Sequence, residues 1–114
     1  MSARPLAVLV VVMLLPACGG SGVSSAADVR SCVAKRVPAS ALGHARVSTV
    51  EGVTTIDYVH GGDETVVTVF PTVKDAQHAM VEEARMGDAH DQRTANVLHS
   101  GGGAVEAAVV ACLH

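Results

Sequence analysis

Three cysteines and six histidines are the side chains of this sequence that could do covalent, redox or metal chemistry. Cysteine sulfur forms disulfides, carries lipids and binds soft metals, and imidazole nitrogen is a common metal ligand. The cysteines are Cys18, Cys32 and Cys112, and no two of them have the Cys-x-x-Cys spacing of a redox-active thiol pair. Their chemistry therefore depends on where the protein is located and on which elements carry them.

The histidines do not have the spacing of a metal site. Two ligands on one helix face usually lie four residues apart, and no two of these histidines do. His78 and Glu82 share a face of an expected helix, but basic side chains lie on that face too, which favours a solvated surface. We therefore expect no metal and no cofactor, with metal or small-ligand binding through His78, His90 or His99 as the alternative. The six positions are His44, His60, His78, His90, His99 and His114.

No catalytic motif accompanies these residues. Gly101-Gly102-Gly103 precedes an expected helix and could bind an anion there, but it lacks the Lys-Ser/Thr of a P-loop, so a flexible turn is expected. The acid pairs Asp63–Glu64 and Glu82–Glu83 are adjacent, so their side chains do not share a helix face. Gly-x-Ser-x-Gly is absent. We predict that the protein is not an enzyme.

The first 18 residues have the features of an export signal. Arg4 is a positive charge near the start, and Leu6 to Leu15 is an uninterrupted apolar run of ten residues. A transmembrane helix needs roughly 20 such residues. The run predicts the hydrophobic region of a secretory signal peptide, which a small-residue site at Ala17 and then Cys18 follow.

Leu15, Ala17 and Cys18 resemble the lipobox of bacterial lipoproteins, with an unusual proline between the first two. The resemblance implies removal of residues 1–17, a diacylglycerol on the Cys18 sulfur, and attachment to the extracytoplasmic side of the cell membrane. The Gly/Ser-rich residues 18–25 would then form a flexible tether. The alternative is an ordinary secretory signal that is cleaved near Ala17.

An exported chain that is lipidated on Cys18 keeps an even pair of cysteines, Cys32 and Cys112. Such a pair outside the cytoplasm predicts a disulfide. It would close a loop of about 80 residues, for which the chain-entropy model gives a stabilisation on the order of 4 kcal/mol. The alternative is two reduced, buried cysteines that act as small hydrophobic residues.

Both cysteines lie on the apolar faces of expected helices. Ser25 and Asp28 resemble a capping box for residues 26–37, and Pro38 ends that run. Residues 104–113 are rich in valine, which is typical of strands. A strand's alternating pattern does not separate their polar from their apolar side chains, whereas a helical period places apolar side chains on one face. The apolar faces are Val29, Cys32, Val33 and Val37 in the first helix, and Val105, Ala108, Val109 and Cys112 in the second.

The middle of the chain predicts a hairpin, a helix and a third strand. Residues 53–59 and 65–70 are rich in β-branched types, and Gly61-Gly62-Asp63 between them favours a turn. Val47 to Val50 is a further short strand or an extension of the first. The remaining expected elements are a helix from Thr72 to about Met86, which Gly87 ends, and a strand from Thr94 to His99.

These elements predict one α+β domain over residues 26–114. We expect a small two-layer sandwich with the order α-β-β-α-β-α and a three-stranded, mainly antiparallel sheet that carries its helices on one face. A β-α-β crossover would make the strand 94–99 parallel to 65–70, and 94–99 would pair with 53–59. Because aromatics are only 2% of the chain, valine and alanine must fill the core.

Composition limits the partners. The formal net charge is −3 and no basic run is present, which argues against nucleic acid. The membrane, reached through the lipid on Cys18, is the expected contact. We predict a non-catalytic, lipid-anchored module that binds a protein or another component of the bacterial envelope.

Overall fold

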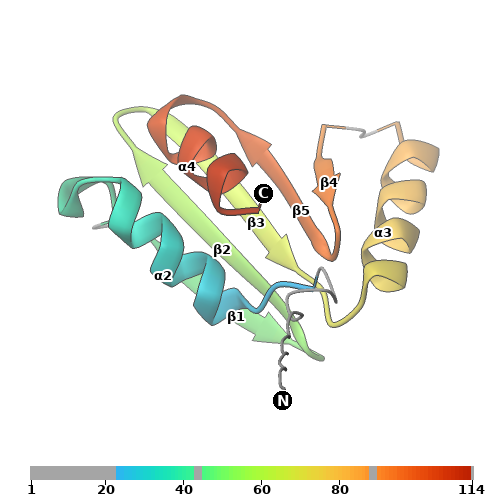
Figure 1. Ribbon diagram of the computed structural model, residues 1–114. Coiled ribbons are helices and arrows are strands. Elements are labelled where there is room, and N and C mark those ends of the chain that lie inside the picture. Colours follow the sequence, from blue (N-terminus) through green and yellow to red (C-terminus); the bar gives the residue numbers. More distant parts are fainter. Residues whose placement is uncertain (1–22, 43–44, 88–89, 114) are drawn as a thin grey trace, which may run out of the picture.

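The computed structural model describes residues 23–42, 45–87 and 90–113, so the predicted signal peptide and Cys18 lie outside the described residues. The α+β class is confirmed (Figure 1). In chain order the elements are α2 (Ala26–Arg36), the short 3-10 helix η2 (Ala39–Ala41), β1 (Arg46–Val50), β2 (Val53–His60), β3 (Asp63–Val69), α3 (Val73–Arg85), β4 (Gln92–Thr94), β5 (Val97–Gly101) and α4 (Gly103–Leu113).

The described part of the sheet has five strands in the order β1-β2-β3-β5-β4, and every neighbouring pair is antiparallel. The expectation of three strands was wrong for two reasons. Glu51-Gly52 forms a turn that makes β1 a separate strand. A second turn, at Ala95-Asn96, interrupts the predicted strand 94–99, so that Thr94 ends β4 and Val97 begins β5. Glu51 and Ala95 have φ angles of 51° and 53°, a left-handed conformation that their residue types do not signal.

The pairing of the last strand also differs from the prediction. β5 lies antiparallel beside β3, so it neither runs parallel to β3 nor pairs with β2. The crossover through α3 does lead to a strand parallel to β3, but that strand is β4, and β5 lies between the two. The tight turn after β4 returns the chain into this gap.

The hairpin of β2 and β3 is confirmed, and its turn has the expected chemistry. Gly61 and Gly62 have φ angles of 59° and 89°. A two-residue turn with positive φ at both central positions matches the right-handed twist of antiparallel strands, and glycine adopts it without steric cost. This turn fixes the register in which Ile56 lies opposite Val67.

Side-chain caps begin α2 and α3 near the predicted residues. The Ser25 hydroxyl accepts a hydrogen bond from the Asp28 amide at 3.0 Å, and the Thr72 hydroxyl accepts one from the Asp75 amide at 3.1 Å. Each cap satisfies a backbone donor that has no partner inside its helix. Pro38 follows α2 and excludes its continuation.

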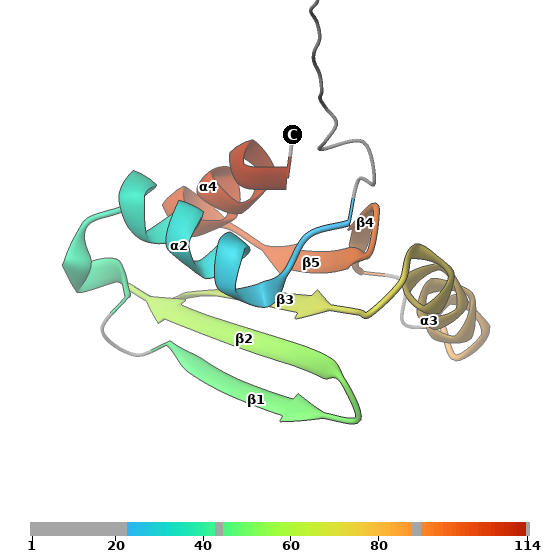
Figure 2. The same ribbon diagram turned by 60° about the horizontal axis from the view of Figure 1, so that its bottom comes forward.

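Helices α2 and α4 lie side by side over one face of the sheet and enclose the main core (Figures 1 and 2). Valine dominates this core, as expected, and Tyr58 is the aromatic side chain in it. The main core consists of Val29, Val33, Val37, Ile56, Tyr58, Val67, Val69, Val97, Val105, Ala108 and Val109.

Helix α3 does not share that face, so the expectation that all helices cover one face was wrong. Leu98 points away from the face of Val97, because successive side chains of a strand alternate. Leu98 and Ala76 are buried outside the main core, and α3 contacts β5 and β4. Figure 2 shows α3 at the β4 end of the sheet, apart from α2 and α4.

The structure places the Sγ atoms of Cys32 and Cys112 2.04 Å apart, at disulfide distance, with 5.9 Å between their Cα atoms. The two cysteines lie on α2 and α4, the terminal helices on which the helical spacing placed them. Because 80 residues separate the two cysteines, the chain-entropy value on the order of 4 kcal/mol applies.

The chain enters the domain beside the turn between β4 and β5. The Ser24 amide donates to Asn96 Oδ1 at 2.8 Å, and Asn96 Nδ2 donates to the Ser24 carbonyl at 2.8 Å. The predicted tether, residues 18–25, therefore includes at its end Ser24 and Ser25, which the domain holds in place. Its remaining described residue is Val23.

Candidate functional site

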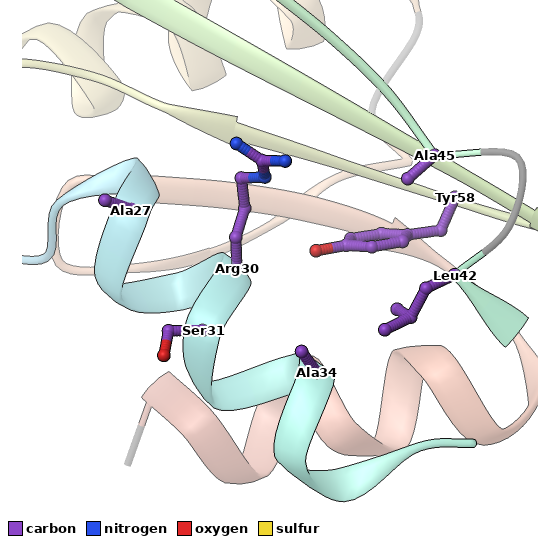
Figure 3. A pocket seen from close by; sticks show the side chains of 7 residues that line it. All are labelled: Ala27, Arg30, Ser31, Ala34, Leu42, Ala45 and Tyr58. Carbon is purple, nitrogen blue, oxygen red and sulfur yellow. The ribbon is translucent and has the colours of Figure 1, made fainter. Parts of the chain in front are cut away.

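A cavity of about 370 Å³ opens between α2, η2 and the start of the sheet (Figure 3). Its volume is within the range of roughly 300–1,000 Å³ that is usual for small-molecule sites. The lining residues are Ala27, Arg30, Ser31, Ala34, Leu42, Ala45 and Tyr58. We call this cavity the α2–β2 pocket.

One face of α2 forms a wall of this pocket. Ala27, Arg30, Ser31 and Ala34 have the spacing i, i+3, i+4 and i+7, which places them in one stripe along the helix. Val29 and Val33 lie on a different stripe and are buried in the core. Three of the four wall residues are small, so they leave open space where α2 crosses the sheet.

Tyr58 reaches into the pocket from β2. Its side chain is 3% exposed, and Figure 3 shows the ring extending toward α2 with the hydroxyl oxygen directed at the part of the helix that carries Arg30. No hydrogen bond joins this hydroxyl to another described residue. Burial raises the pKa of Tyr58 above its ordinary value of 10.0, and the nearby Arg30 charge partly opposes that rise.

Arg30 is the cation of the pocket. It lies on the exposed side of α2, and among the described residues no carboxylate forms an ion pair with it. Arg30 and Tyr58 line the same pocket, and the Tyr58 hydroxyl is directed toward the part of α2 that carries Arg30 (Figure 3). Arg30 and Tyr58 thus supply a cation and a hydroxyl donor to a cavity whose other lining residues are Ser31 and apolar side chains.

The pocket is suited to binding rather than to proton transfer. Its lining residues include no histidine, cysteine, aspartate or glutamate, so they supply no general base at neutral pH. Ser31 has no base beside it among these residues that would make its hydroxyl a nucleophile. The arrangement offers apolar contacts together with hydrogen-bond donors and one positive charge.

The structure does not bring the predicted histidine candidates together. His78 on α3 and His90 are exposed, whereas His99 is buried on β5 and its Nδ1 lies 3.0 Å from Glu106 Oε2 on α4. That contact joins the sheet to α4, although Glu106 Oε1 is buried without a hydrogen bond within the described part of the chain. The described residues contain no group of three or more metal-ligating side chains. His44 and His114 lie outside the described residues.

Gly101 ends β5, Gly103 begins α4, and Gly103 packs closely against one of the protein's own carboxylates. A Cβ atom on Gly103 would lie 2.6 Å from Asp63 Oδ2. This carboxylate is at the N-terminus of α4, where the helix dipole favours a negative charge. An external anion is therefore not expected at Gly101–Gly103. The Asp63 carboxylate occupies the start of α4 and does not pair with Glu64.

The sheet brings together a different acid pair, which the adjacent pairs in the sequence did not indicate. Asp57 on β2 and Glu64 on β3 are diagonal neighbours on the face opposite α2 and α4. A hydrogen bond and the charge of Asp57 raise the pKa of Glu64, while Arg46 opposes the rise. Asp57 Oδ1 is buried without a partner among the described atoms. The pair lies on another surface from the pocket.

Comparisons with protein-family models, curated proteins and solved structures found no match for this chain. The geometry of the α2–β2 pocket and the features of the sequence are therefore the basis for assigning a function. Within the described range, no helix has both the length and the hydropathy to cross a bilayer.

Sequence reasoning missed the pocket because Arg30 and Tyr58 come from elements that are distant in the chain. Arg30 and Tyr58 are 28 positions apart and belong to no spacing motif. One signal was available. Tyr58 is the single tyrosine in a chain without tryptophan, so a polar aromatic side chain on a predicted strand was a candidate for a binding site.

Proposed function

We propose that this protein is a lipid-anchored, extracytoplasmic binding module and that the α2–β2 pocket binds a small ligand. The pocket is the observation that carries the proposal. It is of ligand size, and it combines apolar walls with a cation and a buried hydroxyl that have no other polar partner among the described residues.

The anchoring part of the proposal rests on the leader sequence. The apolar run from Leu6, the small residue Ala17 and the following Cys18 support lipidation and export. A cysteine pair at disulfide distance is compatible with an oxidising compartment. The hydrogen bonds between Ser24 and Asn96 support a fixed point at which a lipid-linked segment would join the domain.

A pocket ligand is favoured over histidine-bound metal. The candidate ligands His78 and His99 lie on different elements, one exposed and one buried against Glu106. The pocket, by contrast, gathers its polar groups around one open volume.

The anchor is tested by expressing the full chain in a bacterium with lipoprotein-processing enzymes. We expect the protein in the detergent phase of a phase-partition assay. Its intact mass should show loss of residues 1–17, addition of a diacylglycerol to Cys18, and two fewer hydrogens on Cys32 and Cys112 than after reduction. A Cys18→Ser variant is the matched control and should lose the lipid mass. Recovery of the uncut chain from the cytosol would refute the anchoring proposal.

Ligand binding is tested through Tyr58 itself. Because the chain has one tyrosine and no tryptophan, its intrinsic emission reports on the pocket alone. Short apolar molecules such as hexan-1-ol should change this emission in a saturable way. Ala34→Phe, which fills the pocket from α2, should abolish the change. An equal response in that variant would show that binding does not take place in the pocket.

A further inference from the structure

We infer that the ligand of the α2–β2 pocket is a monoanion with a short apolar body, such as an aliphatic carboxylate, whose anionic group binds between Arg30 and Tyr58. The inference rests on the proposed binding function and specifies the chemical class that the pocket accepts.

The charge of the ligand follows from Arg30. A guanidinium presents its donors in a planar fork that matches two carboxylate oxygens. Arg30 has no carboxylate partner among the described residues, although acidic side chains outnumber basic ones in the chain. An incoming anion would therefore meet an uncompensated cation instead of displacing an existing ion pair.

The buried phenol supplies a second polar contact. The Tyr58 hydroxyl is directed into the pocket and makes no hydrogen bond with a described residue, so a ligand oxygen can accept its proton. A tyrosine phenol is protonated at neutral pH, and burial raises the Tyr58 pKa further, so the hydroxyl is a donor there. A carboxylate can accept from Arg30 and Tyr58 together, whereas an amine can accept from neither in its protonated form.

The number of charges and the apolar walls limit the class further. Arg30 is the single side chain among the lining residues that is charged at neutral pH, so a dianion such as phosphate would bring one charge without a partner. The remaining volume faces the Leu42 side chain and the methyl groups of Ala27, Ala34 and Ala45. Contact with these groups favours a ligand whose other end is apolar.

The experiment compares hexanoate, hexan-1-ol and hexylammonium, which share a chain length and differ in charge. The exported protein, in the processed form that its intact mass defines, is titrated with each while Tyr58 emission is recorded. We expect hexanoate to bind at least tenfold more tightly than the alcohol, a difference of about 1.4 kcal/mol. Arg30→Gln should remove this tenfold advantage by weakening hexanoate far more than the alcohol. Arg36→Gln, a charge change on the same helix outside the pocket lining, should alter hexanoate binding less than twofold.

The outcomes separate the ligand class from the binding function. If the alcohol or the ammonium binds as tightly as hexanoate, or if Arg30→Gln binds hexanoate undiminished, the inferred class is wrong and the pocket remains a binding site. If none of the three probes changes the emission of the wild-type protein, both the inference and the proposed pocket function are refuted. Inorganic phosphate is titrated alongside, and binding stronger than that of hexanoate would also overturn the monoanion assignment.

Discussion

Replacing Asn96 with alanine should destabilise the domain more than any other single change of a polar side chain that we consider. The side chain is 0% exposed and makes three hydrogen bonds to backbone. Two connect it to the amide and carbonyl of Ser24, and the third runs from Nδ2 to the Phe70 carbonyl at 2.7 Å. Asn96 thereby holds the entering chain and the end of β3 against the turn between β4 and β5.

The magnitude follows from these three bonds. A typical intramolecular hydrogen bond contributes about 1 kcal/mol net, and a buried group that loses its partner costs about 1–3 kcal/mol. The main-chain bond from the Phe70 amide to the Asn96 carbonyl persists in any variant. We therefore expect Asn96→Ala to lower the free energy of unfolding by about 3 kcal/mol. Asn96→Asp should cost at least as much, because it keeps the acceptor and loses both donated bonds.

Urea unfolding followed by circular dichroism measures this change, and hydrogen exchange locates it. The Ser24 amide should exchange slowly in the wild type and rapidly in Asn96→Ala. Ser24→Ala is the matched control, because the hydrogen bonds from Asn96 reach only the backbone of Ser24, and it should cost less than about 0.5 kcal/mol. A loss below about 1 kcal/mol in Asn96→Ala, with the Ser24 amide still protected, would refute the reasoning.

Three further changes test the pocket, the glycine turn and the disulfide. Because burial raises the Tyr58 pKa above the unfolded value, the associated stability is fully present below pH 10 and is lost as pH rises through the folded-state pKa. An ultraviolet titration should give a still higher Tyr58 pKa in Arg30→Gln, and a lower pKa would contradict the proximity of Arg30 and Tyr58. Gly103→Ala should lower the melting temperature, since its φ is 81° and its Cβ would meet a carboxylate at 2.6 Å, while Gly102→Ala, with open space and no positive φ, should not. Replacing both cysteines of the α2–α4 bridge with alanine should reduce the free energy of unfolding on the order of 4 kcal/mol, and an unchanged urea midpoint would exclude that contribution.

The parts of the fold that sequence reasoning predicted are those with local signals. Ser25 and Pro38 mark the ends of α2, and Gly61-Gly62 marks the hairpin turn. The period of the C-terminal apolar residues also separated a helix from a strand, and it placed Cys112 on the face toward α2. Caps, glycines and periodicity act within a few residues, so a single sequence reveals them.

The parts that it did not predict depend on contacts between distant residues. Ala95 is not a typical residue for a left-handed turn position, so Asn96 was the single local sign of a turn between β4 and β5. The insertion of β5 beside β3 depends on that turn and on the burial of Leu98 by α3. Asn96 has no local motif either, because its three hydrogen bonds go to Ser24 and Phe70, which are far away in the chain.

The candidate site shows the same division. The histidines were candidates by residue type, but the fold places His78, His90 and His99 apart, and His99 lies in a buried contact with Glu106. Arg30 and Tyr58 have no informative spacing, and only the crossing of α2 over β2 places them at one cavity. The chemistry of the site therefore arises from packing, which a list of reactive side chains does not contain.

Helix α2 connects the stability of the domain with the shape of its pocket. Val29 and Val33 fix one side of the helix in the core, and Cys32 links it to α4. Arg30, one residue after Val29 in the chain, lies on the pocket side, so the distance from its guanidinium to the Tyr58 hydroxyl depends on how firmly the core and the bridge hold the helix over β2. Because charge-assisted hydrogen bonds require close geometry, a helix free to shift would lose the paired contact before it lost the apolar ones. If the pocket binds a monoanion as inferred, we expect loss of the disulfide to weaken the preference for the anion as well as the stability of the fold.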